Sequence, residues 1–369
     1  MKDELDCQRG KIVSTLRTKM IELLKRDRKR EYLNLCTQNY AEAVSIAQEL
    51  FPEQYQKAGT GMDPFDSLYD KALEAKERGN TEEEIRILKT AVHYGSAMPY
   101  CYERLVILYS KRKNYERARE VCVKWFDAVF WKLPNASTSS LRLLDRLEKL
   151  TEKVITNIRI SLKKAHVQGI PEYRKKLQAN SNNNENFEDV HLEGKASLMF
   201  SKAGCEVTMR DSPDLALRLN NEQFYAEVKH FREKEQDRID TAKMSEPGDY
   251  LVPYGDTFPL EGKHAWEQVY NVAKDKITQY KEHTPYILVI ESSSTSIEDP
   301  EIDMATGEIN EDVNSGKCEG FAKLNGILLT SDWHNISQQW RNVYFFATSS
   351  PAVSLSRELS ALLDKICHG

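Results

Sequence analysis

Residues 212–229 contain two short alternating segments on either side of a polar turn, and this pattern limits the fold more than any other in the chain. Apolar residues recur at every second position: Leu215, Leu217 and Leu219 in the first segment, and Phe224, Ala226 and Val228 in the second. The turn between them is Asn220–Glu222. Period-two alternation around an Asn-containing turn predicts a β-hairpin. This half of the chain therefore needs a β-sheet.

The hairpin also predicts where charged side chains meet. Asp214 and Glu227 both lie at the ends of the segments away from the turn. Lys229 comes two residues after Glu227, so its side chain leaves the strand on the same face. Carboxylate oxygens suit Mg²⁺ or Mn²⁺, and a hard cation beside a lysine suits phosphodiester hydrolysis. The competing interpretation is a surface hairpin with ordinary charges.

These residues resemble a known signature. Pro213-Asp214, twelve further residues and then Glu227-Val228-Lys229 are similar to the PD-(D/E)xK motif of the restriction-endonuclease-like nuclease superfamily. The surroundings agree, because a predicted α-β-β-β-α-β order matches the core order of that superfamily. The predicted elements are a helix over 191–203 that ends at Gly204, a strand over 205–210, the hairpin, a helix over 263–282 and a strand over 286–290.

The resemblance implies roles for individual residues. Asp214 and Glu227 would bind Mg²⁺ or Mn²⁺, with the Val228 carbonyl as a further ligand. Glu193, on the helix before the hairpin, would complete the acidic cluster; Glu188 is the rival, and a solvated helix carboxylate is the alternative for both. Lys229 would position or deprotonate the attacking water. The implied products are a 5′-phosphate and a 3′-hydroxyl, and DNA is the implied substrate.

One feature departs from the superfamily pattern. Some members carry Gln-x-x-x-Tyr on the helix after the motif, but here Gln268 is followed by Val272 and Gln279 by His283. The helix instead offers Lys276 and Gln279, one turn apart on the same face. We expect these two side chains to reach a phosphate or the attacking water, and a solvated helix edge is an equally open interpretation.

Length and composition limit the class of protein. At 369 residues the chain exceeds the size at which one core stops growing, so at least two domains are expected. No run of eighteen apolar residues and no apolar leader are present, so we expect no membrane span and no secretory signal. Seven scattered cysteines without a Cys-x-x-Cys pair indicate reduced thiols and a cytoplasmic protein.

The first half is predicted to be helical. Residues 71–85 and 104–118 look like related helix-turn-helix units, with Asn80 and Asn114 in the same turn and Pro99 opening the second unit. They resemble tetratricopeptide repeats, which implies a protein partner; a plain helical scaffold is the alternative. The predicted fold is therefore multidomain. An all-α tetratricopeptide-like domain over 1–179 and a linker at Asn180–Asn186 precede an α/β restriction-endonuclease-like domain with a central mixed sheet over 187–369.

Charge divides the chain at this predicted boundary. Residues 1–179 hold 34 Lys and Arg against 25 Asp and Glu, a net of +9, whereas residues 180–369 hold 18 against 32, a net of −14. An acidic catalytic half would not attract DNA by its own field. A basic tract in the first half is therefore the predicted nucleic-acid contact, with a solvated helix end as the alternative: Lys25, Arg26, Arg28, Lys29 and Arg30.

The acidic run Ile297–Val313 is predicted to be a solvated insertion with a hairpin tip at Thr306-Gly307. Two strands, over 326–330 and 343–348, and a closing helix over 354–366 are expected after it.

We therefore expect a cytoplasmic, Mg²⁺-dependent nuclease that cleaves DNA within a multi-protein bacterial defence or repair system, antiviral defence included. Its partners would be DNA, a protein bound through the repeats and a second copy of the chain in a homo-oligomer. The alternative is a non-enzymatic adaptor that keeps an inactive nuclease fold and acts through its helical repeats. The complete Asp-Glu-Lys set favours the enzyme, and the acidic second half favours the adaptor.

Overall fold

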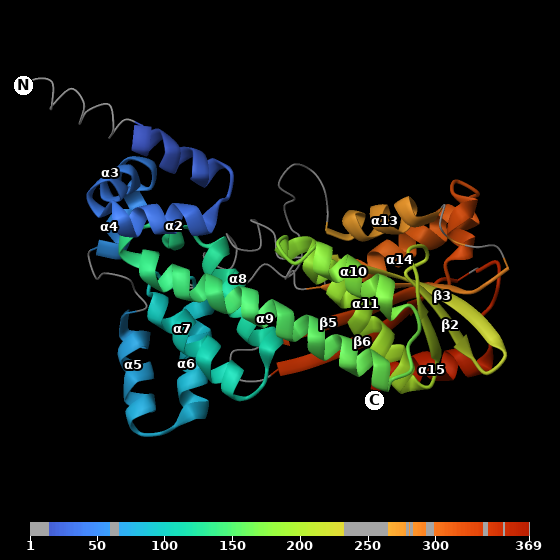
Figure 1. Ribbon diagram of the computed structural model, residues 1–369. Coiled ribbons are helices and arrows are strands. Elements are labelled where there is room, and N and C mark those ends of the chain that lie inside the picture. The colour runs from blue at the N-terminus through green and yellow to red at the C-terminus, as the bar shows by residue number, and fades with distance from the viewer. Residues whose placement is uncertain are drawn as a thin grey trace, which may run out of the picture. The chain divides into compact units, whose positions relative to one another are not determined.

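The chain folds into two compact units that divide at residue 154 (Figure 1). The computed structural model describes residues 15–59, 66–231, 265–277, 280, 283–292, 299–334, 339–349 and 351–368. The first unit is helical and the second contains a six-stranded mixed sheet with helices. The predicted order, a helical domain followed by an α/β domain, is confirmed. In these described ranges no helix is long and apolar enough to cross a membrane.

The first unit consists of helices joined by short turns. Their bounds are α2 Lys29–Gln38, α3 Tyr40–Leu50, α4 Pro52–Gly59, α5 Asp66–Glu77, α6 Thr81–His93, α7 Pro99–Lys111 and α8 Tyr115–Asp127, then the 3-10 turns Val129–Lys132 and Pro134–Ala136, and α9 Ser137–Lys164, which continues into the second unit.

Two helix pairs, α5–α6 and α7–α8, repeat the same turn (Figure 1). Asn80 caps α6 by accepting a hydrogen bond from the Glu83 amide at 3.2 Å, and Asn114 caps α8 by accepting one from the Arg117 amide at 3.2 Å. An Asn side chain satisfies one of the amides left open at a helix start, which fixes where each second helix begins. Both predicted helix-turn-helix units are confirmed.

The second unit is built around one sheet in which the strands follow the order β1-β2-β3-β4-β5-β6. Strands β3, β4 and β5 are parallel, and the remaining neighbours are antiparallel. The bounds are α10 Ile170–Ala179, α11 Asn184–Ala203, β1 Glu206–Met209, β2 Leu215–Leu219, β3 Glu222–Phe231, α13 Ala265–Lys276, β4 Tyr286–Ser292, α14 Asp299–Asn314, the 3-10 turn Glu319–Lys323, β5 Gly326–His334, β6 Gln339–Ala347 and α15 Arg357–His368.

The predicted hairpin is confirmed. Strands β2 and β3 pair antiparallel, and Leu219 faces Glu222 across a turn of Asn220 and Asn221. Asn220 has a φ of +52°, a left-handed conformation that asparagine adopts more easily than most residues. The helix before the hairpin ends at Gly204, which has a φ of +114°. Among the described residues, the elements from α11 to β4 follow the predicted α-β-β-β-α-β order.

Helices cover both faces of the sheet (Figure 1). On one face, Val269 of α13 and Ile302 and Ile309 of α14 share a core with Leu288 and Ile290 of β4. On the other face, α11 contacts β1 and β3 and also touches α15. Because successive side chains of a strand point to opposite faces, Glu227 and Lys229 of β3 project toward the α13–α14 face.

The acidic segment 297–313 differs from the prediction. Its described part is helix α14, not a loop with a hairpin tip, and Thr306 and Gly307 lie in the middle of it. Ile302, Ala305 and Ile309 are fully buried on one side of this helix. Strands β4 and β5 are parallel, and a parallel connection needs a crossover element, which α14 supplies. The sequence interpretation gave weight to the acidic residues and overlooked the helical spacing of the apolar ones.

The boundary between the units also differs from the prediction. Residues 184–186 form the first turn of α11, so only residues 180–183 connect α10 to α11, and the segment Asn180–Asn186 is not a linker between domains. Helix α10 belongs to the second unit, since Gln168 donates to the Val207 carbonyl at 2.9 Å and accepts from the Met209 amide at 3.0 Å. These bonds join the segment before α10 to strand β1, and they explain why a polar, Asn-rich sequence is no domain boundary here.

Candidate active site

Asp214 and Glu227 meet at the open end of the β2–β3 hairpin. The pairing of β2 with β3 begins at Leu215, which lies opposite Ala226, so Asp214 lies just beyond the last backbone pair. There the Asp214 carboxylate replaces a backbone partner, because its Oδ2 accepts a hydrogen bond from the Val228 amide at 2.9 Å. The Asp214 amide in turn donates to Glu227 Oε2 at 3.3 Å. Both carboxyl groups are buried, with residue exposures of 8% and 2%.

Glu227 is further held on the α13–α14 face of the sheet. Lys276 of α13 forms an ion pair with Glu227 Oε1. The hydroxyl of Tyr286, at the start of β4, donates to Glu227 Oε2 at 3.2 Å. Tyr286 is itself fixed by the ring of Tyr280, with centroids 4.4 Å apart. A carboxylate with this many donors has one defined orientation.

Glu193 approaches Asp214 from helix α11, on the other face of the sheet. Its Oε1 accepts from the Lys176 ammonium of α10 at 2.6 Å. The two helices lie close at this point, because Gly194 leaves room for Tyr173, whose hydroxyl oxygen would lie 2.3 Å from a Cβ at residue 194. The charges of Asp214 and Glu227 both act on Glu193.

The three carboxylates affect one another. Burial and the negative charge of Glu227 raise the pKa of Asp214 to about 6, although the Val228 hydrogen bond opposes this shift. Burial and the charge of Asp214 raise the pKa of Glu193 to about 7, although Lys176 opposes it. Groups with raised pKa values in one cluster are typical of functional sites.

Lys229, the lysine of the predicted motif, lies two residues after Glu227 on the same face of β3 and is half-buried. Val228 directs its amide toward Asp214. Because the N–H and C=O groups of one strand residue leave on the same side, the Val228 carbonyl faces that side as well. Of the two predicted residues on the following helix, Lys276 reaches the cluster, and Gln279 lies outside the described residues.

The donor set fits a hard divalent cation in chemistry, since it consists of carboxylate oxygens and a carbonyl. Within the described ranges, no three Asp, Glu, His or Cys side chains are arranged to hold a metal ion together. Lys176 forms an ion pair with Glu193, and Lys276 forms one with Glu227. A cation at Asp214 would have to take these two carboxylates from their lysines.

Most side chains of the predicted nucleic-acid-binding tract form ion pairs with carboxylates of the first unit. Arg26 pairs with Glu22, Arg28 with Glu31 and Lys29 with Asp27. Arg30 contacts Asp145 at 2.7 Å and Glu148 at 2.9 Å. Four of the five predicted cations therefore already have carboxylate partners, which lowers the positive potential available to DNA.

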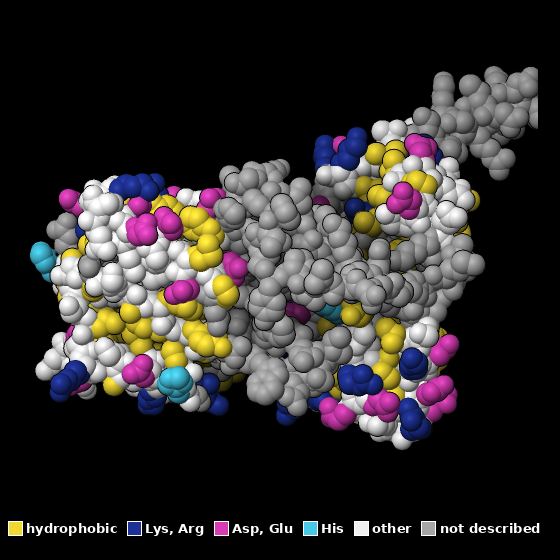
Figure 2. Space-filling view, turned by 180° about the vertical axis from the view of Figure 1, so that it is seen from behind, with side chains coloured by type: hydrophobic (Ala, Val, Ile, Leu, Met, Phe, Trp, Pro, Cys, Tyr) yellow, Lys and Arg dark blue, Asp and Glu magenta, His cyan; other side chains and the backbone are white. Residues whose placement is uncertain are grey.

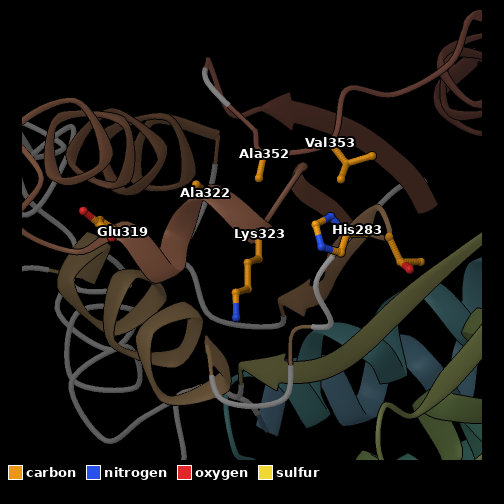
Figure 3. A pocket seen from close by; sticks show the side chains of 7 residues that line it. His283, Glu319, Ala322, Lys323, Ala352 and Val353 are labelled. Atoms are coloured by element: carbon orange, nitrogen blue, oxygen red, sulfur yellow. The ribbon is translucent and has the colours of Figure 1, made fainter.

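A separate cavity of about 240 Å³ opens at the amino ends of β4 and β5 (Figure 3). His283, Lys323 and Val353 are among its lining residues. Among the described residues, none of the predicted site residues lines it, and Glu319 is the acidic side chain at its wall. The carboxylate cluster is therefore the better candidate for catalysis.

Two contributors were missing from the sequence interpretation, Lys176 and Tyr286. The signal for Lys176 was present, because Ile170, Tyr173 and Leu177 have the helical spacing of a buried face. That face places Lys176 next to the core of the second unit, but the predicted boundary assigned it to the first. Tyr286 was read only as the start of a strand.

Comparisons with known proteins give no relatives: the chain matches no protein-family model, no curated protein and no solved structure. The functional argument therefore depends on the residues themselves.

Proposed function

We propose that this protein is a metal-dependent phosphodiesterase that cleaves DNA, with its active site at Asp214, Glu227 and Glu193. The observation that carries the proposal is the convergence of three buried carboxylates and two ammonium groups at the end of one hairpin. Burying acidic groups near one another costs stability, and such groups with perturbed pKa values gather at functional sites. The resemblance to PD-(D/E)xK nucleases supports the same assignment.

The chemistry follows from the residues present. Asp214 and Glu227 would hold Mg²⁺ or Mn²⁺, with the Val228 carbonyl and Glu193 as further ligands. When bound, such a cation polarises the scissile phosphate and lowers the pKa of a water ligand. Lys229 is placed on the face of Glu227, where its ammonium would orient or deprotonate the attacking water and stabilise charge on the phosphate. Tyr286 and Lys276 keep Glu227 in position.

The test is cleavage of plasmid, linear and single-stranded DNA by the purified chain. Cleavage is expected with Mg²⁺ or Mn²⁺ and should stop with chelator, while Ca²⁺ is expected to support binding with little cleavage. Asp214→Asn is expected to abolish cutting. Asp364→Asn is the matched control, because Asp364 is an exposed aspartate of the same unit on α15. Cutting that persists in excess chelator would refute this mechanism.

The charge distribution is compatible with DNA binding once the observed boundary is used. Residues 155–179 hold six basic residues and one acidic residue, and they belong to the second unit. That unit then carries 24 Lys and Arg against 33 Asp and Glu, a net of −9 instead of −14. On the face in Figure 2, Lys and Arg side chains are interspersed with Asp and Glu side chains. DNA contacts would therefore be local, as in the basic α10, instead of arising from one broad positive surface.

One observation favours the alternative, a non-enzymatic adaptor that acts through its helical repeats. Each of the two outer carboxylates already has a lysine partner, so the cluster has a stable state without a metal. Isothermal titration calorimetry with Mn²⁺ separates the two functions. An enzyme takes up Mn²⁺ in a manner that Asp214→Asn prevents, whereas an adaptor gives no heat that depends on Asp214.

A further inference from the structure

Lys176 holds a fixed position beside the carboxylate cluster although it comes from outside the predicted nuclease core. Helix α10 presents Ile170, Tyr173 and Leu177 to the interior, and all three are buried. The Gln168 hydrogen bonds tie the start of this helix to β1. Lys176 follows Tyr173 by three residues, so packing of α10 directs its ammonium toward Glu193.

The environment of Lys176 is anionic on more than one side. The Lys176 side chain is 38% exposed and that of its partner Glu193 is 11% exposed, so the lysine side chain is partly open to solvent. The pKa of Lys176 is raised: burial lowers it, but the hydrogen bond and charge of Glu193 and the charges of Asp214 and Asp211 outweigh burial. The lysine therefore stays charged at neutral pH beside Glu193.

A divalent cation and Lys176 compete for the same carboxylate. If the cation takes Glu193, the ammonium loses its counter-ion while it remains partly buried, and an unpaired charge there is costly. A phosphodiester oxygen is the partner that a nuclease substrate brings to this place, and a lysine ammonium binds phosphate well as a compact point charge.

We propose that Lys176 is a phosphate-binding residue of this site: Glu193 holds its ammonium while no metal is bound, and a DNA backbone phosphate receives it once a divalent cation takes Glu193. This inference rests on the proposed function. It makes α10 part of the substrate-binding surface and couples metal binding to DNA binding. A purely structural lysine would instead stay on Glu193 throughout and would never contact DNA.

The experiment measures the affinity of the full chain for a short fluorescein-labelled DNA duplex across a series of salt concentrations. The assays are run with Ca²⁺, which avoids cleavage, and with chelator. The variants are Lys176→Gln and Lys176→Arg, and the control is Lys202→Gln, which removes the same charge from an exposed position near the end of α11. Thermal unfolding of each variant confirms that it is folded.

One phosphate contact contributes a slope of about −0.9 to the dependence of log K on log salt concentration for duplex DNA. With Ca²⁺, Lys176→Gln is expected to flatten this slope by about 0.9 and to weaken binding several-fold, and Lys176→Arg is expected to keep the wild-type slope. With chelator, Lys176→Gln and wild type are expected to coincide. Lys202→Gln should match wild type in both conditions.

Two results would overturn the inference. Either the Lys176→Gln slope equals that of wild type with Ca²⁺, or the slope falls equally with chelator, so that no transfer from Glu193 to phosphate occurs. The proposed function would be refuted by a different result: the wild type does not cut DNA with Mg²⁺ and gains no affinity from Ca²⁺. That result would also refute the role of Lys176. Cutting by wild type together with an unchanged slope for Lys176→Gln removes the role of Lys176 alone.

Discussion

Both units bury carboxylates, and they do so in different ways. In the helical unit Glu84 of α6 is 1% exposed and meets one partner, Arg104 of α7, through two hydrogen bonds to its two oxygens, at 2.5 and 2.9 Å. In the sheet unit Glu193, Asp214 and Glu227 lie together, and their charges act on one another. The first arrangement is a closed pair, and the second is a cluster of like charges.

The difference indicates what each region contributes. A bidentate pair between Glu84 and Arg104 satisfies both groups and fixes the contact between neighbouring helices, so it is an element of stability. The cluster at Asp214 keeps two acids with raised pKa values, which is unfavourable for stability in the absence of a ligand. We infer that the repeats use their buried charge for structure and the sheet unit uses its buried charge for function.

The largest expected effect is loss of cleavage in Asp214→Asn. This change removes the central charge of the cluster while it keeps a hydrogen-bond acceptor for the Val228 amide. We expect the cleavage rate to fall by about 10²-fold or more, the loss typical of one electrostatic group in an active site. We also expect stability to stay equal or to rise, because repulsion with Glu227 disappears. Rates on plasmid DNA and urea unfolding measure both quantities.

If Asp214→Asn were strongly destabilised, the contrast between the two regions would be lost. The Asp214 carboxylate would then be a structural group like Glu84.

The second expected effect is in Glu84→Gln, which should lower the free energy of unfolding without changing the cleavage rate. Removing one member of a buried pair leaves the other charge unpaired. Arg104 is 19% exposed, so we expect a cost of about 2 kcal/mol, below the range for fully buried pairs. Glu82→Gln is the control, since its pair with Arg112 is exposed and contributes about 0.5 kcal/mol or less.

Urea unfolding followed in the full chain gives both free energies, and the cleavage rate per folded molecule is expected to remain at the wild-type level. A loss of cleavage in Glu84→Gln at full folding would mean that the repeats act on the active site.

The third effect is a pH dependence of stability that belongs to the cluster alone. The native pKa of Glu193 is about 7, above its ordinary value of 4.5, because of burial and the Asp214 charge. Between these values the native state binds more protons than the unfolded state, so the free energy of unfolding falls as pH rises. Without metal, Glu193 should make the protein roughly 2 kcal/mol less stable at pH 8 than at pH 5.5.

Glu193→Gln should remove this part of the slope, and Glu172→Gln, an exposed glutamate on α10, should keep it. Urea titrations in chelator at the two pH values test this. An equal slope in wild type and Glu193→Gln would show that the Glu193 carboxyl does not titrate in this range.

Local patterns were sufficient to predict most elements of the fold. Period-two alternation at Leu215–Leu219 defined the hairpin, and the caps at Asn80 and Asn114 defined the repeated turns, because these signals depend on neighbours in sequence. Prediction failed where tertiary contacts decide. Helix α14 has helical apolar spacing in its acidic sequence, but its place as a crossover depends on the parallel pairing of β4 and β5, which that sequence does not specify.

The sequence likewise pointed to only part of the candidate site. The motif pointed to Asp214 and Glu227, which meet in the structure, and the helical position pointed to Lys276, which pairs with Glu227. Lys176 was not found, because the predicted boundary assigned its helix to the first domain, and its role depends on the tertiary contact of Tyr173 in α10 with Gly194 in α11.

The smallest expected effect concerns the basic tract of the helical unit. Sequence alone predicted that changing Lys25, Arg26, Arg28, Lys29 and Arg30 to Ala weakens DNA binding and flattens its salt dependence. In the structure four of these five cations are neutralised by carboxylates, as with Arg30 on Asp145 and Glu148. Exposed pairs contribute about 0–1 kcal/mol each, so the variant should fold.

We now expect DNA affinity to fall less than twofold and the salt slope to change by less than the value of one phosphate contact, about 0.9. Binding of labelled duplex at two salt concentrations decides the matter. A slope that flattens by several phosphate contacts would mean that DNA displaces these ion pairs, and the charges of the helical unit would then serve binding as well as structure.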